Sequence, residues 1–257
     1  MIEAIFLDFD WTLYSHKNEM IPDSAYKAIK DAQSKNIKVF LSTGRDIEEI
    51  KTFDCRDLQF DGYVLDNGQL LMDKNLNIIE ANYIEGKGKE AVLDIFNNKT
   101  YPIVLRGINC AFINYIDEYV LKAYRDVGSD LPEIKKYENE DILVATIGVK
   151  DNKEKEILSN MLSDLSVTWW HDNSCDAVSK GSDKVVGVNK MIKYFNINKD
   201  NVLSIGDGEN DIGMIKNTAH SVAMGNSIQE VKDVAEYVTS DIDEDGLLNA
   251  FKKYNIV

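Results

Sequence analysis

Two aspartates, Asp8 and Asp10, directly follow a short apolar run near the beginning of the chain. Carboxylates this close in sequence repel one another unless a cation lies between them. Mg²⁺ suits such a position, because it prefers oxygen ligands and often binds through a few carboxylates together with substrate phosphate. A carboxylate beside bound phosphate can also attack phosphorus and form an acyl phosphate, which water then hydrolyses. The pair therefore indicates metal-assisted phosphoryl chemistry.

Three further polar clusters also come at the ends of predicted strands. They are Thr43-Gly44-Arg45, Asp66-Asn67-Gly68 and Gly206-Asp207-Gly208-Glu209-Asn210-Asp211. In an open α/β sheet, sites form at the carboxyl ends of the strands. We therefore expect these clusters, which are distant in the sequence, to meet Asp8 and Asp10 at one edge of a sheet.

This arrangement suggests a chemical task for each residue type. Asp8 can act as the nucleophile, and Asp10 can protonate the leaving oxygen and then activate water. The hydroxyl and backbone N–H of Thr43, together with a lysine, would hold the transferring group. The carboxylates of Asp8 and Asp207 would bind the metal ion, which neutralises charge on the phosphoryl oxygens.

The elements that must position these residues alternate between strand and helix. Buried strands are predicted at 4–8, 37–42, 62–66, 201–205 and 220–224, with a hairpin over about 69–80. Helices are predicted at about 24–35, from about 46, at 184–195, opening at 206–211, from about 227 and at about 245–254. This alternation predicts an α/β fold with a doubly wound parallel sheet.

The middle of the chain, residues 82–180, predicts a second α/β layer with helices and strands of its own. We interpret it as a domain inserted into the sheet domain, which would then comprise residues 1–81 and 181–257. No linker rich in Pro, Gly or Ser marks the boundaries.

The composition of the chain limits the kinds of partner. Its 257 residues include 44 acidic and 29 basic side chains, which give a formal charge of −15. Such a chain repels nucleic acid and anionic lipid, so we expect neither as a partner. An acidic protein also needs a cation to accept an anionic substrate. The three cysteines are far apart and not in CxxC spacing, which is typical of free thiols in a cytoplasmic protein.

With these motifs, the sequence resembles the haloacid dehalogenase-like (HAD) superfamily, specifically its Cof-type sugar-phosphatase branch. The DxDGT box of that family corresponds to Asp8-Phe9-Asp10-Trp11-Thr12, its Ser/Thr motif to Thr43, and its GDGxND motif to residues 206–211. The patterns "vaMGN" and "DEDG" correspond to residues 222–226 and 243–246. The resemblance covers both ends of the chain and implies a Rossmann-like core with an inserted α/β cap domain, where matching is weak except near Trp170-His171 and Asp176.

The resemblance also implies roles for the matching residues. Asp8 would be nucleophile and metal ligand, and Asp10 would be acid/base and a ligand through its backbone carbonyl. The implied metal is Mg²⁺, with Asp207 as a further ligand and Asp211 as a ligand through water or a support. The implied phosphate contacts are Thr43, Gly44, Lys184 and Asn210. Lys184 is in register with the family's lysine, and Lys180 is the second choice.

Trp11 is the one departure from the DxDGT box, because the family has Gly at this position. Our hypothesis is that Trp11 projects towards the cap and narrows the substrate pocket. Arg45 is either part of that pocket or an ion-pair residue. Asn67 is interpreted as a turn residue, and His16 as structural or exposed.

The sequence thus predicts a Mg²⁺-dependent phosphatase that acts on a small phosphorylated metabolite, such as a sugar phosphate or a phosphorylated cofactor, through an aspartyl-phosphate on Asp8. Two alternatives stay open. One is a phosphoryl transferase or phosphomutase with the same nucleophile, and the other is a catalytically silent protein that binds a phosphorylated ligand. The protein could be a monomer or a homodimer.

Overall fold

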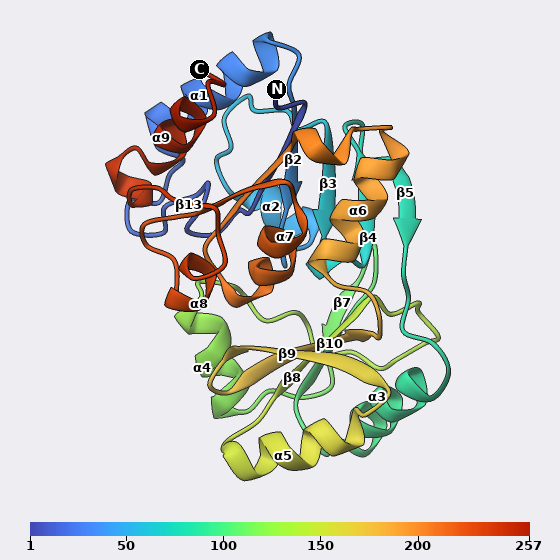
Figure 1. Ribbon diagram of the computed structural model, residues 1–257. Helices are drawn as coiled ribbons and strands as arrows, with labels where there is room; N and C mark the ends of the chain where they lie inside the picture. Colours follow the sequence, from blue (N-terminus) through green and yellow to red (C-terminus); the bar gives the residue numbers. More distant parts are fainter. The chain divides into compact units, whose positions relative to one another are not determined.

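The computed structural model of the protein describes residues 1–257, which form two compact units. We call Met1–Glu80 with Asp183–Val257 the core unit, and Ala81–Ser182 the inserted unit. Figure 1 shows the chain leaving the core unit after strand β5 (Ile78–Ala81) and returning to it at helix α6 (Lys184–Tyr194). No helix combines the length and the apolar character that crossing a membrane requires.

The core unit is built on an eight-stranded sheet with the order β13-β12-β11-β1-β2-β3-β4-β5. The pairs from β13 to β3 are parallel, and β4 runs antiparallel to β3. The carboxyl ends of β11, β1, β2 and β3 therefore lie at the same edge. The bounds of the other strands are β1 (Ala4–Leu7), β2 (Lys38–Ser42), β3 (Gly62–Leu65), β4 (Leu70–Asp73), β11 (Val202–Gly206), β12 (His220–Ala223) and β13 (Tyr237–Val238).

Both faces of the middle of this sheet are covered, which explains why β1 is a continuous apolar run. In β1, Ile5 and Leu7 belong to one hydrophobic cluster, whereas Ala4 and Phe6 belong to another. Helices α1 and α9 contribute to the first cluster, and α6 and α7 to the second. The predicted doubly wound α/β fold is confirmed. The remaining helices of the core unit are α1 (Asp23–Ser34), α2 (Ile47–Thr52), α7 (Ile212–Asn217), α8 (Gln229–Lys232) and α9 (Gly246–Lys253).

The inserted unit has an antiparallel sheet with the order β7-β6-β8-β10-β9. Helices α3 and α5 share a hydrophobic cluster with β6 and β8, while Val120 of α4 packs on Val104 and Ile113. The unit therefore has a hydrophobic core of its own. Its elements are α3 (Gly86–Asn98), β6 (Ile103–Arg106), β7 (Ala111–Ile113), α4 (Glu118–Asp126), β8 (Val144–Gly148), α5 (Asn152–Met161), β9 (Leu165–His171) and β10 (Ser174–Ser179).

Two local features of the core unit differ from the sequence-based prediction. The helix expected to open at 206–211 begins later, because Glu209–Asp211 form a 3₁₀ turn (η3) ahead of α7. The two-residue strand β13 was not predicted, since so short a strand gives no periodicity. Neither difference changes the sheet order around β1.

A tight loop joins β3 to β4 and fixes the beginning of α6. The loop is the 3₁₀ turn Asp66–Gly68 (η1), in which Gly68 has a φ of 92°. A Cβ on Gly68 would lie only 2.2 Å from the carbonyl oxygen of Asp183. Asp183 caps α6 by accepting a hydrogen bond from the backbone N–H of Val186 at 2.9 Å. Gly68 therefore permits the close approach that places the first residue of α6, Lys184.

We expect Gly68→Ala to lower the free energy of unfolding more than Gly128→Ala does. Gly128 also has a positive φ, 69°, but no atom lies within 4 Å of its Cβ position. Both variants acquire the cost of a left-handed residue, about 1 kcal/mol, and only Gly68→Ala must also displace backbone, which adds about 1–3 kcal/mol. Urea unfolding of both variants measures the difference. Equal losses would show that the contact with Asp183 does not constrain the loop.

Candidate active site

The carboxyl ends of neighbouring strands bring the predicted residues together. The backbone N–H of Asp8 donates to the carbonyl of Ile205 at 3.0 Å, which extends the β1–β11 pairing by one residue. The backbone N–H of Thr43 donates to the carbonyl of Val64 at 2.9 Å, just after β2. The sheet therefore fixes the backbone at both positions.

Lys184 lies in the middle of the site, although it begins a helix rather than ending a strand. Its ammonium Nζ is 2.7 Å from Oδ1 of Asp8 and 2.6 Å from Oδ1 of Asp211. The residue is buried, with 2% of its surface exposed. Burial alone would lower the pKa of the ammonium, but the Asp211 and Asp8 carboxylates outweigh burial and raise it. Lys184 is therefore a permanent cation that joins three distant segments of the chain.

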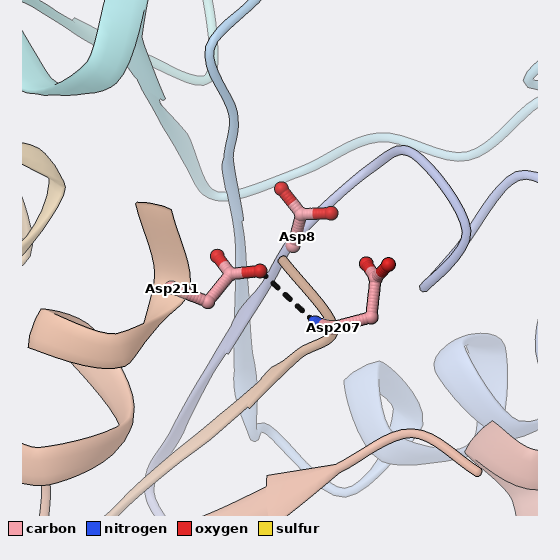
Figure 2. Close-up of side chains that lie close together, drawn as sticks. All are labelled: Asp8, Asp207 and Asp211. Carbon is pink, nitrogen blue, oxygen red and sulfur yellow. Dashed lines mark hydrogen bonds between the residues drawn. The ribbon is translucent and has the colours of Figure 1, made fainter. Parts of the chain in front are cut away.

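Three carboxylates, those of Asp8, Asp207 and Asp211, face one another in the core unit, and one oxygen from each lies within 4.8 Å of the other two (Figure 2). We call them the acidic cluster. Burial, followed by the charge of Asp211, raises the pKa of Asp8 well above its ordinary value and that of Asp207 to about 7. Lys184 can balance only one of the three negative charges. The cluster therefore needs protons or a further cation.

Asp211 is held differently from the other two members of the acidic cluster. Its Oδ2 accepts hydrogen bonds from the backbone N–H groups of Asp207 and Gly208, both at 3.0 Å. Figure 2 shows the first of these contacts as a dashed line to the backbone of Asp207. Gly206 makes room for this arrangement, since a Cβ there would lie 2.4 Å from Cγ of Asp211. Because both of its oxygens are engaged, Asp211 is better suited to support the cluster than to bind a metal directly.

The donor set of the acidic cluster fits a hard divalent ion. Its candidate ligand atoms are all carboxylate oxygens, which Mg²⁺ prefers. Asp8 and Asp207 are the most suitable direct ligands, and Thr12 orients Asp207 by donating from Oγ1 to its Oδ1 at 2.9 Å. A divalent cation would also balance the negative charge that Lys184 leaves over.

Asp10 does not belong to the acidic cluster, and its carboxylate contacts two other side chains. Arg45 Nε and Nη2 donate to the carboxylate at 2.8–3.0 Å, and Nε2 of His16 lies 2.5 Å from Oδ1. Burial would raise the pKa of Asp10, but hydrogen bonds from His16 and Arg45 outweigh it and hold the pKa below its ordinary value. Arg45, for which the sequence left two interpretations, thus forms an ion pair. His16 was missed because no motif marks it.

The remaining predicted phosphate contacts lie around Asn67. A Cβ on Gly44 would be 3.1 Å from Nδ2 of Asn67, and Nδ2 of Asn210 donates to Oδ1 of Asn67 at 3.1 Å. Thr43 accepts a hydrogen bond from the backbone N–H of Arg45 through its Oγ1 at 3.1 Å. Asn67 is a turn residue, as predicted, with a φ of 53°. Its side chain also links two predicted phosphate-binding segments, which the sequence did not indicate.

Trp11 adopts a left-handed backbone conformation with a φ of 58°, which is unusual for a bulky residue. It is 41% exposed, and its ring centroid lies 5.3 Å from that of His16. The carbonyl of Trp11 accepts a hydrogen bond from Nδ2 of Asn226 at 2.8 Å, and Asn226 in turn accepts one from the backbone of Ile242. The loop around Trp11 is therefore held from its backbone and leaves the side chain partly exposed.

A model of the haloacid dehalogenase-like hydrolase family matches residues 5–251. The chain belongs to this family. It is 28% identical to the Bacillus subtilis protein YkrA, over 99% of this chain and 98% of YkrA. It is 27% identical to the Bacillus subtilis 5-amino-6-(5-phospho-D-ribitylamino)uracil phosphatase YcsE, over 98% and 96% of the two chains.

Solved structures of HAD enzymes have the same fold. A HAD subclass IIB sugar phosphatase has a TM-score of 0.86 and 29% identity, with 99% of this chain and 100% of that chain covered. A HAD phosphatase from Bacteroides thetaiotaomicron has a TM-score of 0.88 and 26% identity, with 100% and 96% covered. The predictions of an enzyme, and of a HAD hydrolase of the Cof-type branch, are confirmed.

The raised pKa of Asp207 predicts a pH-dependent stability of the metal-free protein. Below about pH 4, Asp207 is protonated in both the folded and the unfolded states and has no effect. As the pH rises to about 7, the unfolded chain loses this proton first, so Asp207 increasingly destabilises the fold. We expect Asp207→Asn to become more stable than the unsubstituted protein over this range, by at most about 1.4 kcal/mol per pH unit.

Urea unfolding in EDTA at about pH 5 and about pH 8 measures this difference. Added Mg²⁺ is the control, because binding to the folded protein should reverse the advantage of Asp207→Asn. If the difference in free energy of unfolding between the two proteins stayed constant with pH, Asp207 would not have a raised pKa in the folded state.

Proposed function

We propose that the protein is a Mg²⁺-dependent phosphatase that hydrolyses small phosphomonoesters through an aspartyl-phosphate on Asp8. The observation that carries this proposal is the contact of Lys184 with Asp8 inside the acidic cluster. This contact supports the proposal, because it holds the proposed nucleophile beside a fixed cation and the proposed metal ligands at one strand end. Such a site suits a reaction in which negative charge must be held while a new bond to phosphorus forms.

In the first half of the reaction, an oxygen of Asp8 attacks phosphorus and the bond to the leaving oxygen breaks. The phosphoryl oxygens would contact Thr43, Gly44, Lys184 and Asn210. Mg²⁺, when bound by Asp8 and Asp207, supplies positive charge that neutralises the phosphoryl oxygens. The backbone carbonyl of Asp10 is the further ligand proposed from the family resemblance. The side chain of Asp10, in its protonated carboxylic acid form, protonates the leaving oxygen and becomes a carboxylate.

In the second half, Asp10 accepts a proton from water as the water attacks the aspartyl-phosphate. This step regenerates the Asp8 carboxylate and releases inorganic phosphate. One carboxyl group can serve both steps, because the proton that it gives up in the first half returns to it in the second.

The substrate that we propose is a phosphorylated small metabolite, either a sugar phosphate or a phosphorylated cofactor or its precursor. Two of the similar proteins support this class, since one is a sugar phosphatase and the other acts on 5-amino-6-(5-phospho-D-ribitylamino)uracil. We also propose that the inserted unit, Ala81–Ser182, serves as the cap domain.

We further propose that Trp11 helps to select the substrate. A left-handed conformation is unfavourable for a bulky residue, and strain of this kind persists where the surrounding structure supports it for a function. The exposed ring also lies one residue from Asp10, where the leaving group would be protonated. We therefore expect the indole to contact the leaving group rather than the phosphate.

We expect Asp8→Asn to abolish release of inorganic phosphate while a phosphate ester still binds. An amide is a poor nucleophile, but it leaves the other phosphate contacts in place. Phosphate release from a panel of phosphorylated metabolites, with and without Mg²⁺, measures turnover, and calorimetry measures binding. Asp31→Asn, on an exposed position of α1, is the matched control and should behave like the unsubstituted protein. Turnover by Asp8→Asn at the unsubstituted rate would refute the proposal.

We expect Trp11→Gly to change the order of preference across the same panel with little effect on stability. Relief of backbone strain, about 1–2 kcal/mol, offsets the flexibility of Gly, about 0.5–1 kcal/mol, and the lost contact with His16. Trp11→Phe keeps a ring and serves as the comparison variant. Relative kcat/KM values that stay the same in Trp11→Gly would exclude a role in selection.

A further inference from the structure

Two side chains that the proposed reaction does not use, Arg45 and His16, both contact the carboxylate of Asp10. We propose that they are positioning residues, which fix the place and orientation of this carboxyl group for its two proton transfers. The same hydrogen bonds outweigh burial and lower the pKa of Asp10, so the protonated group gives its proton readily to the leaving oxygen, and the ionised group is the form that accepts a proton from water. This inference rests on the proposed function and deepens it. We call Arg45 and His16 the Asp10 clamp.

Two nitrogens of the Arg45 guanidinium donate to the carboxylate of Asp10. Nε lies 3.0 Å from Oδ1 and 2.9 Å from Oδ2 of Asp10, and Nη2 lies 2.8 Å from Oδ1. A planar guanidinium that reaches both oxygens restricts rotation of the carboxylate as well as its position. A single ammonium group could balance the charge of Asp10 but could not set the plane of its carboxylate.

Arg45 is itself held in place, as a positioning residue must be. Its side chain is 12% exposed, its guanidinium carbon lies 4.7 Å from the ring centroid of Phe53, and Nη1 is 3.7 Å from Oε1 of Glu49. The backbone carbonyl of Arg45 accepts a hydrogen bond from the N–H of Asp66 at 3.1 Å. A buried, stacked and paired arginine loses little further freedom when it orients Asp10.

His16 completes the clamp from the other end of the loop that follows β1. The loop turns back on itself, with the N–H of Trp11 donating to the carbonyl of Tyr14 at 2.9 Å. The ring of His16 packs on those of Tyr14 at 5.2 Å and Phe53 at 6.1 Å. The ring of Phe53 therefore packs beside both members of the clamp.

The clamp also keeps Asp10 apart from the acidic cluster. Asp10 comes only two residues after Asp8, yet its carboxylate pairs with Arg45, whereas that of Asp8 pairs with Lys184. Lys184 already has two carboxylate partners of its own, Asp8 and Asp211. An unclamped Asp10 could then rotate away from the leaving oxygen that it must protonate.

This role predicts a dependence on the leaving group. An alkyl phosphate needs the proton from Asp10 for its bond to break, whereas 4-nitrophenyl phosphate has a good leaving group and needs it far less. We expect Arg45→Gln to slow leaving-group release from an alkyl phosphate roughly 10- to 100-fold, as a misplaced catalytic group does. Release of nitrophenol should fall much less, and KM should change little for either ester.

The experiment follows the first turnover with enzyme in excess, so that later attack by water does not limit the observed rate. Arg45→Lys should react with the alkyl phosphate faster than Arg45→Gln but more slowly than the unsubstituted protein. Lysine keeps the positive charge but cannot donate to both carboxylate oxygens from one planar group. The rate of leaving-group release should fall less in His16→Gln, which keeps a hydrogen-bond donor, than in His16→Phe. Arg56→Gln is the matched control, since Arg56 also pairs with an aspartate, Asp23, and stacks on a ring, that of Tyr26.

Two results would overturn the clamp. One is an equal loss for both esters, which a merely structural role gives, and the other is a raised KM with unchanged kcat, which indicates a substrate contact. Thermal unfolding of Arg45→Gln and Arg56→Gln is the stability control. If both variants lose the same stability, a slower reaction in Arg45→Gln alone is an effect on chemistry and not on folding. If Asp8→Asn turned over at the unsubstituted rate, the proposed function would have failed, whatever the clamp variants show.

Discussion

The contact of the buried Lys184 ammonium with Asp8 and Asp211 is the interaction on which the site depends. It joins the end of β1, the η3 turn and the first turn of α6, which are separated by up to 176 residues in the sequence. Leaving either carboxylate buried without this cation would cost about 3–5 kcal/mol. The close approach at Gly68 follows from the same requirement, because α6 must begin beside the β3–β4 loop for Lys184 to reach the cluster.

Much of this arrangement could be predicted from the sequence, for identifiable reasons. Buried parallel strands such as β1 and β2 are short apolar runs, and their carboxyl ends must share an edge, so Asp8, Thr43 and Asp207 could be placed together without coordinates. The order of the motifs then indicated the family. Lys184 needed the family resemblance as well, because a lysine at the beginning of a helix is not distinctive by itself.

The parts that the sequence did not reveal depend on tertiary geometry. His16 meets Asp10 only because the loop after β1 turns back on itself, and no spacing rule marks that turn. The side chain of Asn67 reaches Asn210 across 143 residues. The ion pair of Arg45 with Asp10 was one of two open interpretations, since a motif can locate a residue at a sheet edge but cannot give the direction of a long side chain.

The charge balance of the site links substrate binding to metal binding. Lys184 contacts two carboxylates, and Arg45 holds both oxygens of Asp10, so the positive charge of these two side chains is not enough to balance a phosphate dianion as well. With Asp8 and Asp207 ionised, an arriving phosphate would meet an excess of negative charge. Burial, followed by this excess of charge, raises the pKa of both groups. Protons could relieve it, but a protonated Asp8 is a poor nucleophile. A divalent ion relieves the repulsion and leaves Asp8 ionised, which is why the same carboxylates that make the site acidic also make it suitable for phosphoryl chemistry.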